Sequence, residues 1–237
     1  MRRGRWFGVA FTIFCVHLSL SVVVFAQAWR EKAPAEWTLE EMLEILRHSP
    51  WAQEKFILIP TGRLTRYPIA VGQKRVASGS EVPERLPAVY LVRWESAATV
   101  EQAFARLAAL EEATVAKFLS EPPRLQGDYY VLTCKAKEPP ESSRYELFAR
   151  FKAVELRERA ELKAEHGAPA KPTLVLRTGV GANAAVHFYF PRQVNEQPLL
   201  TPGDTWVEFR FRGRHTAELK AKFRLADIGL APATSQL

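Results

Sequence analysis

The alternation of apolar and charged residues is strongest near the C-terminus, where it predicts a β-hairpin. Apolar residues occupy every second position of 207–211 and of 217–225. A three-residue loop, Gly213–His215, would set Phe209 opposite Leu219, so that the apolar positions of both strands share one face. The same register pairs Arg210 with Glu218 and Glu208 with Lys220. We therefore predict an antiparallel hairpin with one core face and one charged face.

Other segments carry the apolar, β-branched pattern of strands. The lengths and flanking turn residues predict strands over 55–59, 88–95, 128–136, 174–178 and 185–190. The last two flank a glycine-rich turn, 179–183, and are expected to pair as a second hairpin.

Helices are expected at three places, each marked by a Ser/Thr-x-x-Glu/Gln pattern. The first helix follows the capping box of Thr38 and Glu41 and ends near His48. The second extends over 97–119 and has Thr99 and Gln102 as its capping pair. The third follows Ser143 and Glu146, with an apolar face of Leu147, Phe148, Phe151 and Val154. The apolar pattern of this helix fades after Glu155, so the helix is expected to end either near Arg159 or near Glu165.

The stretch from Pro60 to Pro87 is rich in glycine and proline and is expected to be a solvated loop, with a strand at 67–71 as an option within it. It carries basic residues, which offer a second interpretation, contact with an anionic surface such as phospholipid or cell-wall polymer. They include Arg63, Arg66, Lys74 and Arg75.

Together these elements predict an α+β fold with a mostly antiparallel sheet, about three helices and a C-terminal β-hairpin. The expected organisation is one domain over 29–230 and a disordered tail over 231–237. The two-domain alternative places a boundary at Pro139–Pro140 or at Gly167–Pro172.

Residues 1–28 have the pattern of an export signal. Arg2, Arg3 and Arg5 precede an apolar run, and Ala26-Gln27-Ala28 provides the small-x-small site of a signal peptidase. The apolar run is nearly long enough to span a bilayer, so an uncleaved signal-anchor is the competing interpretation. Both place the rest of the chain outside the cytoplasm, in the periplasm or the extracellular space.

Composition narrows the class of partner. The formal charge of +7 falls to +4 once the three arginines of 1–28 are removed, which gives no indication of nucleic-acid binding. After that removal Cys134 is the one remaining cysteine, so no intramolecular disulfide is expected. Its position on the apolar face of the 128–136 strand indicates an inert buried thiol.

The sequence carries no recognised catalytic, metal-binding or nucleotide-binding motif, so neither a metal site nor a cofactor is expected. The histidines His48, His166, His187 and His215 lack metal-ligand spacing, and each is expected at the surface. Gly179-Val180-Gly181 lies between two strands and not before a helix, so it offers no phosphate site.

Arg93, Trp94 and Glu95 form the candidate binding segment, because they lie where a strand gives way to a helix. Arginine beside tryptophan suits a sugar or an anion. In the competing interpretation Trp94 fills the helix–sheet junction and Ser96 caps the helix.

Several short segments resemble a group of uncharacterised exported bacterial proteins. The similar segments are Trp37-Thr38-x-Glu40-Glu41, Ser49-Pro50-Trp51-Ala52, Val92-Arg93-Trp94-Glu95-Ser96-Ala97, Phe190-Pro191-Arg192 and Lys222-Phe223-x-Leu225-x-Asp227. The resemblance spans most of 37–228 and implies an exported protein of one architecture. It implies no activity and no catalytic residue.

The sequence thus favours an exported cell-envelope protein that acts as a non-catalytic binding or accessory module. Its expected partner is an envelope protein or an envelope polymer, with membrane contact only through an uncleaved signal segment. Two alternatives stay open, a hydrolase whose site is built from dispersed residues such as Glu95, His187 and Asp204, and a signal-anchored assembly factor.

Overall fold

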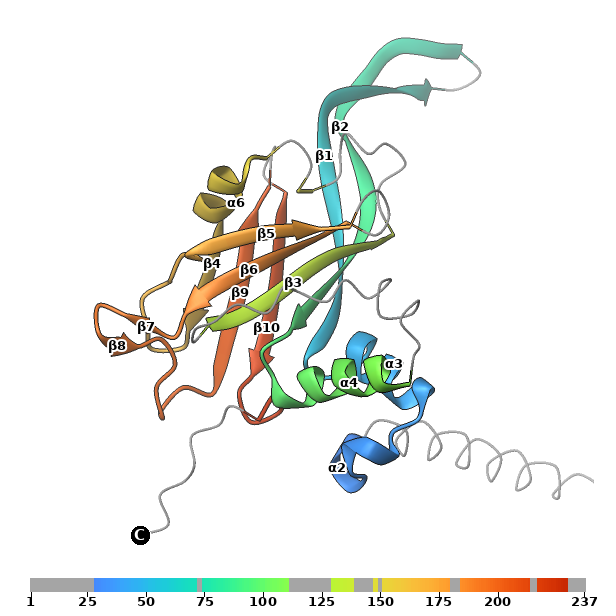
Figure 1. Cartoon of the computed structure of the whole chain (residues 1–237). Coiled ribbons are helices and arrows are strands. Elements are labelled where there is room, and N and C mark those ends of the chain that lie inside the picture. Colours follow the sequence, from blue (N-terminus) through green and yellow to red (C-terminus); the bar gives the residue numbers. More distant parts are fainter. Residues whose placement is uncertain are drawn as a thin grey trace, which may run out of the picture.

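Two antiparallel sheets lie face to face, and one of them extends into a long hairpin arm (Figure 1). The computed structural model describes residues 28–71, 74–110, 129–138, 147–148, 151–179, 184–213 and 217–229. Its helical elements are α2 (Ala28–Glu31), η1 (Pro34–Glu36), α3 (Leu39–Arg47), α4 (Ala98–Ala109) and α6 (Ala153–Arg159). Its strands are β1 (Ala52–Val71), β2 (Lys74–Trp94), β3 (Tyr129–Glu138), β4 (Ala160–Ala164), β5 (Leu174–Thr178), β6 (Ala185–Pro191), β7 (Gln193–Val194), β8 (Gln197–Pro198), β9 (Trp206–Arg212) and β10 (Glu218–Arg224). The predicted α+β class with antiparallel sheets and a C-terminal hairpin is confirmed.

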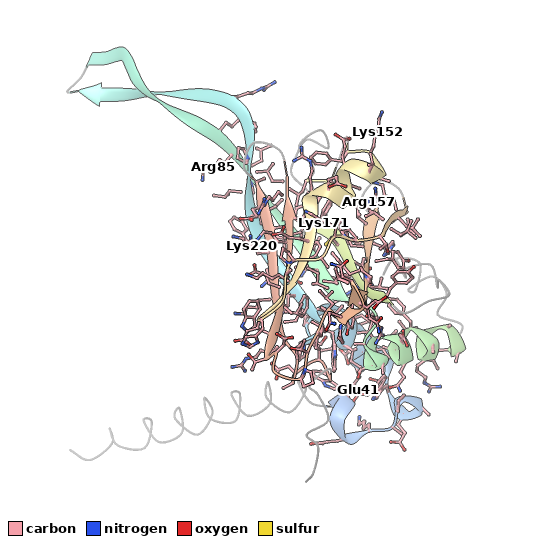
Figure 2. All side chains as sticks on the ribbon, turned by 90° about the vertical axis from the view of Figure 1, so that its left-hand side faces the viewer. Glu41, Arg85, Lys152, Arg157, Lys171 and Lys220 are labelled. Carbon is pink, nitrogen blue, oxygen red and sulfur yellow. The ribbon has the colours of Figure 1, made fainter. Side chains whose placement is uncertain are left out.

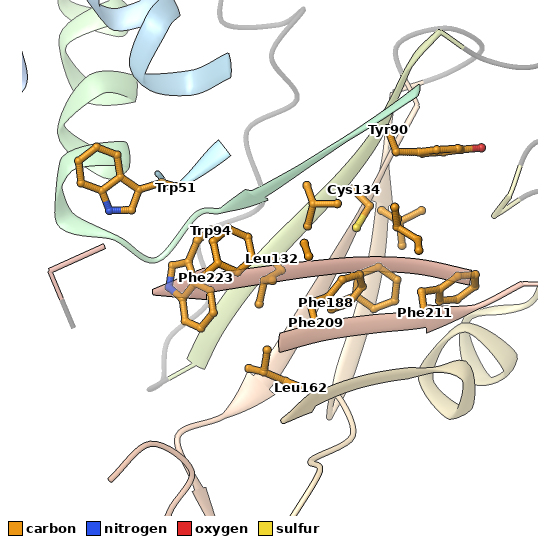
Figure 3. Close-up of a cluster of buried hydrophobic side chains, with 14 of the residues drawn as sticks. Trp51, Tyr90, Trp94, Leu132, Cys134, Leu162, Phe188, Phe209, Phe211 and Phe223 are labelled. Carbon is orange, nitrogen blue, oxygen red and sulfur yellow. The ribbon is translucent and has the colours of Figure 1, made fainter. Parts of the chain in front are cut away.

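The core lies between sheet A, ordered β1-β2-β3-β6-β5, and sheet B, ordered β10-β9-β4. Alternation along β6 directs Phe188 and Phe190 toward sheet B, where the Phe188 and Phe209 rings lie 5.2 Å apart. Phe211 joins the same cluster (Figure 3). Rings of this size dominate the apolar area removed from water, so this aromatic layer holds the two sheets together.

The hairpin of β1 and β2 corrects the loop expected over 60–87. Both strands continue through this stretch and pair from Ala52↔Arg93 to Val71↔Lys74, so that the arm projects beyond the rest of the molecule (Figures 1 and 2). Two irregularities absorb residues that do not fit the ladder, one between Pro60 and Leu64 and one between Tyr67 and Ile69. Bulges of this kind tolerate glycine and proline within a strand, which is why composition alone favoured a loop.

The expected contact of this stretch with an anionic surface stays a prediction. Of the four basic residues named for this interpretation, Arg66, Lys74 and Arg75 have side chains that lie outside the described part of the structure. The fourth, Arg63, is exposed near the base of the arm.

Helix α3 confirms the first capping box. The Thr38 hydroxyl accepts from the Glu41 amide (3.2 Å), and the Glu41 carboxylate accepts from the Thr38 amide (2.9 Å). The second capping box is wrong, because α4 begins one residue before Thr99 and its N-cap, Ala97, makes no side-chain hydrogen bond. Ser96 does not cap α4 either, since its hydroxyl accepts from the amide of Val131 on β3. The described part of α4 ends at Ala109, and residues 111–128 lie outside the described residues.

The third helix is shorter and later than expected. Leu147 and Phe148 form a turn and are buried, whereas α6 begins only at Ala153 and leaves Val154 exposed. The predicted cap of 143 and 146 lies outside the described residues. The helix ends at Arg159, the nearer of the two expected ends, and the next five residues form β4 beside β9.

Both late hairpins form, but the last one has a different register. Strands β5 and β6 pair from Leu174↔Tyr189 to Thr178↔Ala185, as predicted. In β9–β10, Phe209 lies opposite Ala221 and not opposite Leu219. The loop is therefore five residues long, from Gly213 to Ala217, and the predicted three-residue loop is wrong. A shift of two residues keeps every side chain on its predicted face, which is why periodicity did not reveal it.

The two ends of the described chain meet at Trp51. Trp29 packs edge-on against the Trp51 ring (5.4 Å), and the Trp51 Nε1 donates to the carbonyl of Ile228 (3.2 Å). The expected signal peptide, apart from Ala28, and the expected tail 231–237 lie outside the described residues. Among the helices of the described part, none has the length and hydropathy that crossing a membrane requires.

Candidate functional site

The face of sheet A that points away from sheet B carries a row of buried polar side chains. Arg93 lies opposite Thr133, and Thr133 lies opposite His187, on three neighbouring strands. Their exposed fractions are 1%, 2% and 0%. Side chains directly opposite each other on one face are in contact range, so the register builds a continuous polar layer.

Arg93 and Glu95 form an ion pair within this layer. They are two residues apart at the end of β2, which puts both side chains on one face, and the Arg93 Nη2 and Nε lie 2.6 and 2.8 Å from Glu95 Oε1. The Arg93 Nη1 also donates to the carbonyl of Leu46 in α3, and the guanidinium lies 5.0 Å from the centre of the Phe104 ring in α4. The pair therefore fastens α3 and α4 to sheet A.

His187 is held by two threonines. Its Nδ1 lies 2.7 Å from Thr133 Oγ1, and its Nε2 lies 2.6 Å from Thr178 Oγ1. Burial, and secondarily the charge of Arg93, lowers the pKa of His187 from its ordinary 6.5 to about 4. The expectation of a surface histidine is therefore wrong. Sequence reasoning also missed both threonines, although each lies at an alternating position on the same sheet face.

Two further side chains near this polar layer have shifted pKa values. Burial, followed by the negative charge of Glu95, raises the pKa of Tyr189 to about 12. Burial, followed by the charges of Arg93 and Arg47, lowers the pKa of Lys135. Because all of these groups are partly or fully removed from water, the layer serves to hold strands and helices in place.

Trp94 is separated from the other two residues of the candidate segment. It points into the core between the sheets, where its ring lies 5.5 Å from both Tyr130 and Phe223, whereas Arg93 and Glu95 point to the opposite face. All three side chains are at most 4% exposed. A ligand that uses the three together would have to reach both faces of one strand, so the segment serves packing here.

The remaining candidate groups are engaged in local structure. Asp204 accepts from the Thr201 amide (2.6 Å) and from the His166 amide (2.9 Å), which closes the turn before β9. The His48 ring lies 3.1 Å from the carboxylates of Glu44 and Glu54. His215 lies outside the described residues. The structure brings Glu95 and His187 to one sheet face but assigns Asp204 to a turn.

The surface candidate lies where the hairpin arm leaves the body. Phe56 lies opposite Val89, and Leu58 lies opposite Pro87, on the same face as Arg93. Phe56 is 66% exposed and Leu58 is 45% exposed. We call these four residues, Phe56, Leu58, Pro87 and Val89, the root patch. Large apolar side chains grouped on a surface mark contact sites more often than isolated ones do.

The arm is anchored just beyond the root patch by a specific bulge. The Thr61 hydroxyl donates to the Glu84 carboxylate (2.8 Å) and accepts from the Arg63 amide (3.1 Å). Thr61 is 8% exposed, so this bulge marks the point where the hairpin leaves the core. These interactions fix the base of the arm relative to the sheet.

In the parts of the chain that the structure describes, no cluster of three or more His, Cys, Asp or Glu residues is arranged to hold a metal ion. Comparisons with protein-family models, with curated proteins and with solved structures find no match for this chain.

Proposed function

We propose that this protein is exported and acts in the cell envelope as a non-catalytic binding module that docks an envelope protein at the root patch. The observation that carries this proposal is the exposure of Phe56 and Leu58 side by side on the edge strand of sheet A. Monomeric soluble proteins seldom leave neighbouring large apolar side chains on an unpaired strand edge, because such edges promote aggregation.

The backbone of β1 favours a partner that adds a strand. The Trp94 amide donates to the Trp51 carbonyl, which fixes the positions of β1 whose backbone groups are hydrogen-bonded to β2. The amides and carbonyls of Glu54, Phe56 and Leu58 are at the alternate positions and therefore point away from β2, to the outer edge of the sheet. Within the described residues β1 is the last strand of its sheet. An extended segment of a partner would pair with these backbone groups and cover the root patch with alternating apolar side chains.

The state of the candidate catalytic groups also supports a binding role. Glu95, His187 and Asp204 are at most 4% exposed, and each has a close interaction with a neighbouring residue. A hydrolase needs such groups within reach of a substrate. A binding module needs only the exposed edge.

Site-specific photo-crosslinking tests the proposal. A photoreactive residue in place of Leu58 is compared with one in place of Lys163, which is exposed on β4 of sheet B. We expect one envelope protein to be captured through position 58 and not through position 163, with loss of the adduct when Phe56 is changed to Ser. Equal labelling at both positions would contradict the proposal, as would turnover of envelope glycans or peptides that a Glu95→Gln change abolishes.

Mass spectrometry of the N-terminus separates the released form from the anchored one. The proposal expects a chain that begins at Trp29, the residue that follows the small-x-small site. A chain that retains Met1 in the membrane fraction would instead support the signal-anchored assembly factor.

A further inference from the structure

The face of sheet B that points away from sheet A is a charged surface. Its three strands alternate buried apolar side chains with outward polar ones, as Leu219, Ala221 and Phe223 do on β10. The outward charged positions include six basic residues and three acidic ones. These are Lys163, Arg210, Arg212, Lys220, Lys222 and Arg224, and Glu161, Glu208 and Glu218.

The three carboxylates of this face converge on one guanidinium in its middle strand. Arg210 lies 2.9 Å from Glu208, 3.3 Å from Glu161 and 3.3 Å from Glu218. Charge pairs of this kind raise the pKa of Arg210, although burial alone would lower it. The acidic groups of the face are therefore gathered around its centre.

The outer strand of the sheet carries a row of cations, of which Lys220 lies 2.7 Å from Glu218 and Arg224 lies 3.9 Å from Asp227. Lys220, Lys222 and Arg224 occupy successive outward positions of β10 and are exposed, at a spacing of about 7 Å along the strand. β10 is the last strand on its side of sheet B in the described part of the chain. Positive charge is therefore concentrated along one edge of the face.

An aromatic ring lies at the end of this row. Trp206 lies opposite Arg224 in the ladder, and the Lys222 ammonium lies 3.7 Å from the centre of the Trp206 ring. The indole is half-buried, so part of its apolar surface meets water between two cations. We call Trp206, Lys220, Lys222 and Arg224 the cationic row.

We propose that the cationic row binds a linear glycan whose sugars carry carboxylate groups. The ammonium and guanidinium groups pair with the carboxylates, and arginine can do so with two parallel hydrogen bonds. The part of the flat indole that meets water offers an apolar surface to the face of a sugar ring. An extended strand with outward side chains at a regular spacing matches a ligand that repeats its charge along a chain.

Charge complementarity favours this occupant over a protein segment. Three exposed cations along one edge outnumber the two carboxylates that contact them, Glu218 and Asp227, and therefore suit a ligand with repeated negative charge. The inference rests on the proposed function only for the location of the protein in the envelope. The root patch lies on the face of sheet A that points away from sheet B, whereas the cationic row lies on the outer face of sheet B. The two edge strands meet where the Gln53 side chain of β1 donates to the Lys222 carbonyl of β10 (2.7 Å).

Titration calorimetry with the purified full chain tests the inference. The probes are polygalacturonate, a linear polymer of carboxylated sugars, and dextran, which is neutral. We expect polygalacturonate to bind at least tenfold more tightly than dextran, with an affinity that falls as salt is raised. Equal affinity for the two polymers, or no binding of polygalacturonate, would overturn the inference.

Two charge-matched double variants show whether the position of the cations matters. Lys222→Gln with Arg224→Gln should weaken polygalacturonate binding about tenfold. Lys152→Gln with Arg157→Gln removes the same charge from exposed positions at α6 and should stay within about twofold of the parent chain. Lys152, Arg157 and Lys220 are labelled in Figure 2. Equal losses in both double variants would mean attraction to net charge alone and would overturn the inference.

A third variant separates sugar recognition from charge attraction. Trp206→Leu keeps every charge and should weaken polygalacturonate binding about fivefold, whereas binding of inorganic polyphosphate, which has no sugar ring, should not change. Identical behaviour of the two polymers with this variant would overturn the sugar specificity. A cooperative melting transition shows that each variant is folded.

The outcomes also separate this inference from the proposed function. A position-58 adduct to an envelope protein, together with no binding of polygalacturonate, would leave the proposed function intact and overturn the inference. Binding of polygalacturonate with the expected losses, in the absence of any position-58 adduct, would support the inference and overturn the docking role of the root patch.

Discussion

Thr133 Oγ1 lies 2.7 Å from His187 Nδ1, and this contact joins two central strands of sheet A through side chains as well as backbone. Thr178 closes the other side of the ring at 2.6 Å. A neutral imidazole has one donor and one acceptor, and a hydroxyl can serve as either, so both nitrogens are satisfied without a charge. The arrangement keeps the histidine in its neutral form inside the fold.

The first prediction concerns the pH dependence of stability. Because the pKa of His187 is about 4 in the folded chain and 6.5 in the unfolded chain, the unfolded chain takes up the proton first as the pH falls. The contribution of neutral His187 is fully present above pH 6.5 and is lost between pH 6.5 and about 4, a change of about 3 kcal/mol. Urea unfolding at a series of pH values measures it.

A histidine-to-glutamine variant isolates this contribution. His187→Gln should flatten the fall in unfolding free energy between pH 6.5 and 4, because glutamine does not titrate in this range. Parallel curves for the parent chain and His187→Gln would show that His187 is protonated at similar pH in both states.

The second prediction concerns the Arg93–Glu95 pair. Arg93→Met leaves the Glu95 carboxylate buried without its guanidinium, and the loss of unfolding free energy should be about 3–5 kcal/mol. The double variant, Arg93→Met together with Glu95→Leu, removes both charges and should recover most of that loss. A double-mutant cycle in urea measures the coupling, and a coupling near zero would place the pair outside the low-dielectric interior.

The third prediction compares two capping patterns of the same sequence type. Thr38→Ala removes the acceptor for the Glu41 amide at the start of α3 and should cost about 1 kcal/mol. Thr99→Ala should change stability by less than about 0.5 kcal/mol, because α4 begins before it. Thermal unfolding of the two variants measures these losses of stability. Equal losses would mean that Thr99 caps a helix in solution.

The fourth prediction tests the register of β9 and β10. Lys222 lies opposite Glu208 and 3.7 Å from the centre of the Trp206 ring, so Lys222→Glu should cost about 1 kcal/mol. Lys220 lies opposite Arg210 and 2.7 Å from Glu218, so Lys220→Glu exchanges the contact with Glu218 for one with Arg210 and should cost less than Lys222→Glu. In the register with a three-residue loop, Lys220 would lie opposite Glu208, and Lys220→Glu would then cost more unfolding free energy than Lys222→Glu.

The fifth prediction concerns the turn between β7 and β8. Asn195 and Glu196 both adopt left-handed backbone conformations, with φ values of 51° and 64°. A two-residue hairpin turn of this kind favours glycine at its second position. Glu196→Gly should therefore raise the unfolding free energy by about 0.5–1 kcal/mol. A decrease would show that the Glu196 side chain contributes to stability in another way.

Local pattern predicted the elements that one short segment can specify. The capping box at Thr38 and the alternation of the late strands depend on residues within one turn or one strand, and both appear in the structure. Alternation also predicted which side of β3 carries Cys134, and the thiol is buried there. Alternation could not predict which residues lie opposite each other in the last hairpin, because a register shift of two residues leaves every side chain on the same face of the sheet.

The candidate site depended on contacts between distant segments. Arg93, Thr133, His187 and Thr178 come together only through the order of β2, β3, β6 and β5, so neither their burial nor their mutual contacts could be inferred from local sequence. The same holds for Ala160–Ala164, which is a strand because β9 lies beside it, although its sequence also suits a charged helix.

For this protein the sequence by itself determined the α+β class, the first helix and the apolar face of each late strand, since periodicity and capping act over a few residues. Only the tertiary structure decided that the glycine- and proline-rich stretch is an arm and that the polar residues of sheet A form an interior layer. Pairing between strands and burial between layers are properties of segments far apart in the chain, and no local pattern encodes them.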